Sequence, residues 1–115
     1  MKTVKSSNLI QPLEDRHRDY LKDESRTSGK AESISFPLNE AEVQAMVKIL
    51  SGRQTPITVQ GSRTGITGGA VPVGGHILNL SRMTKVMGLE LDQNGRFSIR
   101  VQPGIGLSEL DQHLY

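Results

Sequence analysis

Cysteine is absent from the 115-residue chain, which excludes disulfide bonds, cysteine-ligated metal sites and thiol catalysis. This absence fits a reducing compartment, and we expect a cytoplasmic protein. Tryptophan is also absent and aromatic residues make up only 3% of the chain, so Ile, Leu, Val and Met must fill the core. No apolar run approaches the ~18 residues that a membrane span needs, and the N-terminus lacks an apolar signal core. The sequence therefore predicts no membrane span.

Charge of one sign does not dominate the chain. The formal net charge is +2, from 14 Lys and Arg residues against 12 Asp and Glu residues, and this mild excess suits a phosphate-bearing ligand. The basic residues are dispersed instead of clustered on one face, which argues against nucleic-acid binding. His17, His76 and His113 are isolated from one another and show no metal-ligand spacing, so we expect structural or surface roles for all three.

The region that follows the N-terminal 30 residues predicts a βαβ unit. A strand is expected at 33–36 and another at 56–60, and the helix between them makes the two strands parallel. Asn39 is a good N-cap, Glu42 stands in capping-box position, and Gly52 is expected just past the end of the helix. One helical face is predicted to pack in the core, because its apolar residues recur at i, i+3, i+4 and i+7: Val43, Met46, Val47 and Leu50.

A smaller mixed sheet and a final helix are expected next, which makes the fold class α+β. Strands are predicted at 76–80, 86–92 and 97–101, with an Asn94-Gly95 turn before the last of them. Apolar residues alternate with polar ones in that last strand, so we expect one buried face. Leucines at helical spacing begin a helix at Leu107.

Two regions are expected along the chain. Residues 1–30 are a polar N-terminal extension with one or two short helical turns, in which Arg16, His17 and Arg18 are predicted to form a solvated face. Residues 31–115 are expected to be the first half of a larger domain. The helix that starts at Leu107 would be marginal alone, and its apolar stripe needs a partner to cover.

The stretch 61–75 carries the chemistry, since it contains six glycines between two predicted strands. Residues without a Cβ atom let backbone N–H groups approach a ligand closely and converge on an anion. The loop is not of the Walker A type, because no Gly-Lys-Ser/Thr follows the glycines. A strand instead of a helix follows it, which also excludes the Rossmann fingerprint. A glycine-rich hairpin or bulged loop without a ligand remains the alternative.

The run PITVQGSRTGITGGAVP at 56–72 resembles the pyrophosphate loop of FAD-binding domains of the vanillyl-alcohol oxidase/p-cresol methylhydroxylase (PCMH) type. Flanking segments resemble the same family in order and spacing: YLKDE at 20–24, NEAEV at 39–43, LNLSRM at 78–83 and VQPG at 101–104. Within the family, the loop is most similar to the group of D-2-hydroxyacid dehydrogenases that includes D-lactate dehydrogenase and the FAD subunit of glycolate oxidase.

The resemblance implies FAD as the cofactor and an N-terminal portion of a PCMH-type domain as the fold. Pro37 and the Pro103-Gly104 turn would lie near the adenine end. No catalytic residue and no metal ligand is implied within this chain. The resemblance assigns the FAD pyrophosphate to one set of loop residues: Gly61, Ser62, Arg63, Thr64, Gly65, Gly68, Gly69 and Ala70.

For the complete protein, the resemblance implies oxidation of a small 2-hydroxy acid, of the glycolate or D-lactate type, to the 2-oxo acid. We expect the 115-residue chain alone to be inactive, to retain FAD weakly or not at all, and to self-associate through exposed edges. The alternatives are an oxidase of the same superfamily with another substrate, a non-catalytic nucleotide- or phosphate-binding module, and a partner subunit of a flavoprotein.

Overall fold

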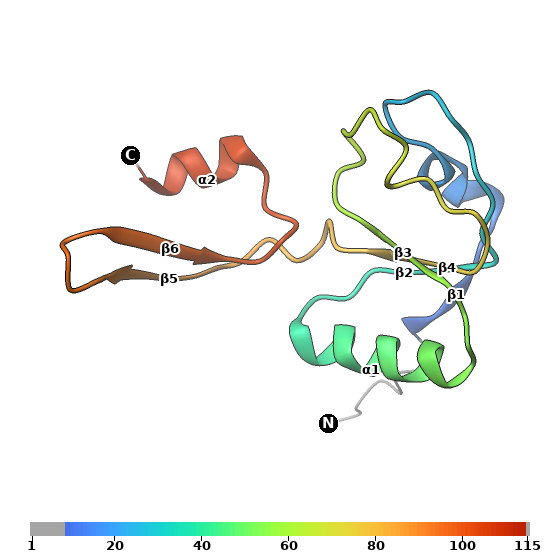
Figure 1. The fold of residues 1–115 in the computed structure, drawn as a ribbon, viewed down its shortest axis with the longest axis horizontal. Helices are drawn as coiled ribbons and strands as arrows, with labels where there is room; N and C mark the ends of the chain where they lie inside the picture. The colour runs from blue at the N-terminus through green and yellow to red at the C-terminus, as the bar shows by residue number, and fades with distance from the viewer. Residues whose placement is uncertain (1–8, 115) are drawn as a thin grey trace.

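The computed structural model describes residues 9–114, and its centre is a four-stranded sheet (Figure 1). The sheet contains β1 (Gln11–Pro12), β2 (Ser33–Ser35), β3 (Ile57–Gln60) and β4 (His76–Asn79) in the order β1-β2-β4-β3. Both β2 and β3 are parallel to β4, and β1 is antiparallel to β2. The predicted parallel direction of the βαβ strands is confirmed, and β4 lies between them.

Helix α1 (Glu40–Gly52) crosses one face of this sheet, below it in Figure 1. Its start is capped as the sequence predicts: the Glu42 backbone N–H donates to Asn39 Oδ1 at 2.8 Å. Met46 and Leu50 pack with Leu78 of β4 in one half of the core. Two predictions about α1 are wrong, because 41% of the Val47 surface is exposed and Gly52 lies inside the helix, whose C-cap is Arg53.

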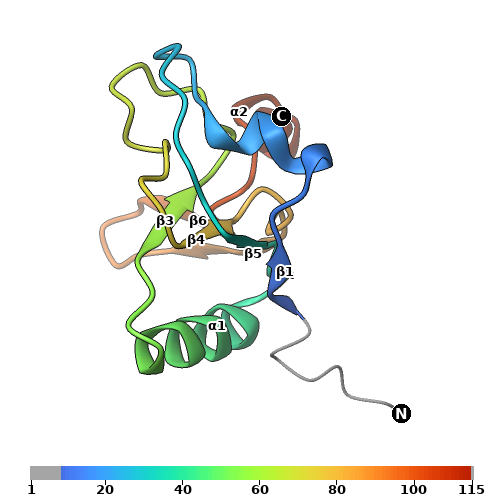
Figure 2. The same cartoon turned by 90° about the vertical axis from the view of Figure 1, so that its right-hand side faces the viewer.

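The opposite face of the sheet is covered by the N-terminal segment, which includes the 3-10 helix η2 (Asp15–Leu21) (Figure 2). Ile34, Phe36 and Ile77 form the core here, and Leu13, Tyr20, Leu21 and Ala31 pack against them. His17 is buried beside this cluster, so its predicted place on a solvated face is wrong. Its ring Nδ1 accepts a hydrogen bond from the Glu14 backbone at 3.1 Å, which sequence periodicity does not reveal.

A two-stranded antiparallel sheet extends away from the four-stranded one (Figure 1), formed by β5 (Val86–Leu91) and β6 (Phe97–Val101). The predicted turn between them is confirmed, with Gly95 at φ +77°. The predicted buried face of β6 is wrong, because Phe97 is 70% exposed. Alternation shows that one face is apolar, but another element has to cover that face before it is buried.

Helix α2 (Leu107–Leu114) follows β6 and is the last element described (Figure 1). None of its residues is buried, and Leu107 is 85% exposed. Neither α1 nor α2 is long and apolar enough to cross a membrane, and the same holds for every helix within residues 9–114.

Candidate functional site

The carboxyl ends of three parallel strands meet at one edge of the central sheet. Phe36-Pro37 follows β2, Gly61 follows β3, and Leu80-Ser81 follows β4. Open parallel sheets bind ligands outside this edge, because the loops that leave the strands converge there. The glycine-rich stretch begins at this edge, directly after β3, and then returns across the sheet to enter β4 (Figure 1).

Gln60, the last residue of β3, holds the loop in place through hydrogen bonds from its buried side chain. Only 1% of its surface is exposed. Its amide Nε2 donates to the carbonyl of Tyr20 at 2.6 Å and to the carbonyl of Ala70 at 2.8 Å. Its Oε1 accepts from Asn79 Nδ2 at 3.0 Å, which fixes the orientation of the amide. Gln60 therefore joins the two ends of the loop to each other and to the N-terminal segment.

The loop is held through its carbonyl oxygens. The Gly68 carbonyl accepts from the Val71 backbone at 3.1 Å, and the Pro72 carbonyl accepts from the Lys30 backbone at 3.0 Å. Together with the bond from Gln60 to Ala70, these contacts leave the donor side of the loop backbone unused. An ordered loop that keeps its N–H groups free is suited to bind an acceptor-rich ligand.

A run of free backbone N–H groups is the result. Within residues 9–114, none of the N–H groups from Gly61 to Thr67 donates a hydrogen bond to the protein. A Cβ atom added at Gly61 or at Gly65 would meet nothing within 4 Å, so the space beside both residues is open. Successive free N–H groups beside open space form an anion-binding surface that needs no helix dipole.

Arg63 is the one basic side chain of the loop, and it turns back onto the N-terminal segment. Its guanidinium lies 4.5 Å from the ring centroid of Tyr20, and its Nη1 donates to the Asp19 carbonyl. Its backbone is left-handed, with φ 58°. These contacts place the positive charge at the rim of the loop and reduce the freedom of the guanidinium.

The structure thus brings the predicted loop residues together at one edge of the sheet, in two environments. The exposed members are Gly61, Ser62, Thr64, Gly65 and Gly69. The half-buried members, Arg63, Gly68 and Ala70, lie against the N-terminal segment.

Sequence reasoning missed the polar residues behind the loop. Gln60 and Asn79 are direct partners in the β3–β4 register and are both buried. Asp23 is 8% exposed, and its Oδ1 accepts from the Ser25 backbone at 2.8 Å. A polar residue at the last position of each of two apolar strands was the available signal, because such residues face the carboxyl edge of a parallel sheet.

His76 lies inside the sheet, away from the loop N–H groups. It is fully buried, and its two ring nitrogens are each 2.7 Å from a serine hydroxyl of β2, those of Ser33 and Ser35. Burial lowers the pKa of His76 to about 4, so the imidazole is neutral at physiological pH. Residues 9–114 contain no group of three or more His, Cys, Asp or Glu side chains that could hold a metal ion.

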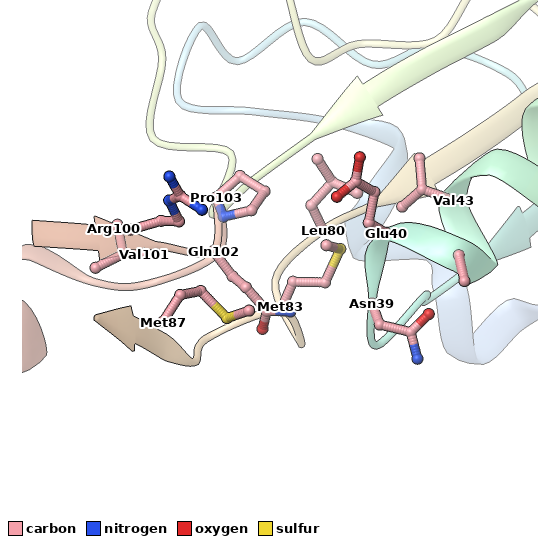
Figure 3. A pocket seen from close by; sticks show the side chains of 11 residues that line it. Asn39, Glu40, Val43, Leu80, Met83, Met87, Arg100, Val101, Gln102 and Pro103 are labelled. Carbon is pink, nitrogen blue, oxygen red and sulfur yellow. The ribbon is translucent and has the colours of Figure 1, made fainter. Parts of the chain in front are cut away.

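A pocket of about 630 Å³ lies between the start of α1 and the base of the β5–β6 hairpin (Figure 3). Gln102 lines the pocket and is held by two hydrogen bonds, because its Nε2 donates to the Leu38 carbonyl at 3.3 Å and its Oε1 accepts from the Lys85 backbone at 3.0 Å. Pro103 is in the pocket wall, whereas Pro37 is buried and does not line it. Apolar side chains form most of the remaining wall: Val43, Leu80, Met83, Met87 and Val101.

Comparison with known sequences agrees with this geometry. Residues 31–115 match the profile of a family described as "FAD binding domain". D-lactate dehydrogenase from Anaerostipes hadrus is 34% identical over 99 residues, which are 84% of this chain and 20% of that protein. An uncharacterized FAD-linked oxidoreductase from Mycobacterium tuberculosis is 38% identical over 96 residues, 81% of this chain and 20% of its own length. The chain thus spans about a fifth of the curated relatives it matches.

Solved structures share the fold. The structure of p-cresol methylhydroxylase with substrate bound superposes with a TM-score of 0.73 at 22% identity, covering 94% of this chain and 22% of that one. The structure of 6-hydroxy-D-nicotine oxidase from Arthrobacter nicotinovorans gives 0.71 at 20% identity, covering 90% and 22%. With the sequence match over residues 31–115, these findings show that the chain belongs to the PCMH-type FAD-binding domain family.

Proposed function

We propose that the Gly61–Ala70 loop binds the pyrophosphate of FAD. The observation that carries this proposal is the run of backbone N–H groups that have no acceptor within the described chain while the carbonyls beside them are tied down. A pyrophosphate offers several oxygen acceptors to such a run, and hydrogen bonds from N–H groups to charged oxygens are stronger than neutral ones. The hydroxyls of Ser62 and Thr64 are exposed on the same loop and add donors.

Arg63 contributes charge at the rim in this proposal. Its guanidinium stays on the Tyr20 ring, so it offsets the pyrophosphate charge without having to be ordered by the ligand. The adenine end is directed to the Pro103-Gly104 turn, where the apolar pocket gives a planar base a surface to pack on. When bound, FAD supplies the hydride acceptor, and this part of the protein binds and orients it.

For the complete protein, we propose oxidation of a small 2-hydroxy acid to the 2-oxo acid, with D-lactate and glycolate as the substrate types. Relatives named D-lactate dehydrogenase, from Anaerostipes hadrus and from Archaeoglobus fulgidus, support this choice at 34% and 37% identity. Absence of cysteine supports a cytoplasmic location. The 115-residue chain alone is proposed to be inactive, since it spans only 20% and 16% of the length of the two relatives named D-lactate dehydrogenase.

A titration with FAD, ADP and riboflavin tests the loop assignment. We expect the chain to bind FAD and ADP, which carry a pyrophosphate, weakly but measurably, and not to bind riboflavin, which lacks it. Gly65→Val should weaken FAD at least tenfold and leave the unfolding midpoint unchanged, because the added side chain meets open space in the protein and obstructs only a ligand. Gly88→Val, also free of neighbours within 4 Å, is the matched control outside the loop.

Two results of this titration would contradict the proposal. Riboflavin binding as tight as FAD binding would place recognition outside the pyrophosphate, and unaltered FAD affinity of Gly65→Val would remove the loop from the site. ADP binding without FAD reduction by a 2-hydroxy acid in the complete protein would favour the alternative, a non-catalytic nucleotide-binding module. Bleaching of stoichiometrically bound FAD by D-lactate in the 115-residue chain would refute its proposed inactivity.

We also propose that the chain alone self-associates through the β5–β6 hairpin. Leu91 is the register partner of Phe97, and Leu89 is that of Ile99, so these four side chains share one face. Phe97 and Leu89 are 70% and 63% exposed. A contiguous apolar face of this kind favours association with a second surface.

A further inference from the structure

Two aromatic rings meet where the N-terminal segment packs against the sheet. The sequence contains two Phe and two Tyr residues, and one of each forms this pair. The ring centroids of Tyr20 and Phe36 are 5.2 Å apart in an edge-to-face arrangement, and both rings pack in the core cluster that contains Ile34 and Ile77. Packing of this kind fixes the two rings, so a group that contacts them is held in place as well.

Each ring of the pair carries an arginine. The guanidinium carbon of Arg63 lies 4.5 Å from the centroid of the Tyr20 ring. That of Arg82 lies 4.2 Å from the centroid of the Phe36 ring. Arg63 belongs to the glycine loop that follows β3, whereas Arg82 follows β4. Two segments that leave the sheet at its carboxyl edge thus place one cation each on the same aromatic pair.

The donors of the Arg82 guanidinium are unused within the described chain. No ion pair within residues 9–114 includes Arg82, and its guanidinium donates no hydrogen bond to the protein there. Other arginines are engaged, since Arg16, Arg18 and Arg100 pair with carboxylates. A guanidinium above a ring face keeps its N–H groups at its own edge, where a ligand can reach them. Arg82 is therefore an exposed cation that Phe36 positions and no carboxylate of residues 9–114 neutralises.

The surroundings of the pair also leave the positive charge uncompensated. Asp19, whose carbonyl accepts from Arg63, directs its carboxylate to Lys22 at 3.8 Å. His17 packs beside both rings, and burial is the main cause that lowers its pKa, so it adds no charge of its own at neutral pH. Two cations without counter-charges raise the electrostatic potential at this edge of the sheet, which favours a ligand that carries more than one negative charge.

We propose that Arg82 binds the cofactor pyrophosphate from the β4 side of the site, so that two arginines held on one aromatic pair flank the phosphates. This inference rests on the proposed function of the glycine loop and adds a residue that lies outside that loop. The planar guanidinium suits the role because its N–H groups can donate to two phosphate oxygens at once. The contact with Phe36 lowers the conformational freedom that Arg82 would lose on binding.

Titration with ADP, followed in ¹H–¹⁵N spectra, tests the role of Arg82. Arg82→Gln should raise the ADP dissociation constant about three- to tenfold, because it removes a charged donor, and Arg82→Lys, which keeps the charge, should raise it less. Affinity should also fall less steeply with salt in Arg82→Gln than in the wild type. Arg53→Gln is the matched control with the same change of net charge. Arg53 is exposed and lies between α1 and β3, at the opposite edge of the sheet, so its loss should leave the affinity close to that of the wild type.

The side-chain Nε–H signal of Arg82 gives a readout that mere cover of the Phe36 ring would not move. In the wild type this signal should shift on addition of ADP and stay in place on addition of riboflavin. A signal that ADP leaves in place would overturn the proposal, as would equal affinities of Arg82→Gln and Arg53→Gln. In both cases the proposed function stands as long as ADP still shifts the amide signals of Gly61 to Gly65. If ADP moves neither those amides nor Arg82, the proposed function and this inference both fail.

Discussion

Acid should destabilise this fold through His76, well before its carboxylates are protonated. The imidazole is fully buried between β4 and β2, within 2.7 Å of the hydroxyls of Ser33 and Ser35. Burial holds the pKa of His76 at about 4 in the folded chain, against 6.5 for an ordinary histidine. Protonation therefore favours the unfolded state, because only there does water solvate the imidazolium.

The direction and the size of this loss of stability follow from proton linkage. Below pH 6.5 the unfolded chain binds a proton that the folded chain does not bind until about pH 4. The contribution of the neutral imidazole is thus complete above pH 6.5 and is lost as the pH falls. Between pH 7 and pH 5 the free energy of unfolding should drop by about 2 kcal/mol, and the full shift in pKa corresponds to about 3 kcal/mol.

Urea unfolding followed by circular dichroism at half-unit steps from pH 7.5 to pH 5 measures this loss. His76→Gln cannot titrate in this range, so the stability difference between wild type and variant should shrink by about 2 kcal/mol on acidification. His17 has its pKa lowered mainly by burial and remains in both proteins, so its effect cancels. His113 is exposed, and His113→Gln is the control: its free energy of unfolding should depend on pH in the same way as that of the wild type.

Two outcomes would refute the reasoning. A wild-type free energy of unfolding that stays constant from pH 7 to pH 5 would mean that His76 titrates normally in the fold. A His76→Gln variant that keeps the full acid sensitivity would assign the effect to other groups. Both comparisons are valid only if the free energy of unfolding depends on urea concentration equally steeply in all samples. A change in this dependence would indicate a change in the surface exposed on unfolding.

Two further predictions concern the hairpin and its attachment. Gly104→Ala should destabilise the fold by about 2–4 kcal/mol in urea unfolding, because the new Cβ would lie 2.0 Å from the Leu80 carbonyl; Gly88→Ala, with no neighbour within 4 Å, should change it by less than about 0.5 kcal/mol. Light scattering should show that the 115-residue chain self-associates. Phe97→Lys should abolish this association, whereas Ser98→Lys, on the opposite face of the hairpin, should not. A monodisperse wild-type monomer at high concentration would contradict the proposed self-association.

Local signals in the sequence were sufficient for most of the elements, although they gave no indication of β1. Asn39 and Glu42 predicted the start of α1, and Asn94-Gly95 predicted the hairpin turn, because capping and turn formation depend on neighbours within a few residues. The errors at Val47 and Phe97 have a different origin. Periodicity identifies an apolar face, whereas burial depends on which element covers that face, and that is a long-range property.

By itself, the sequence predicted the kind of site: six glycines in residues 61–75, followed by a strand, favour backbone recognition of an anion over the Rossmann and Walker types of site. Only the tertiary structure decided which donors are free. Gln60 and Asn79 meet because β3 and β4 pair in register, and Arg63 contacts the Asp19 carbonyl and the Tyr20 ring because the N-terminal segment packs against the loop. Such contacts join residues tens of positions apart, so local sequence patterns cannot predict them.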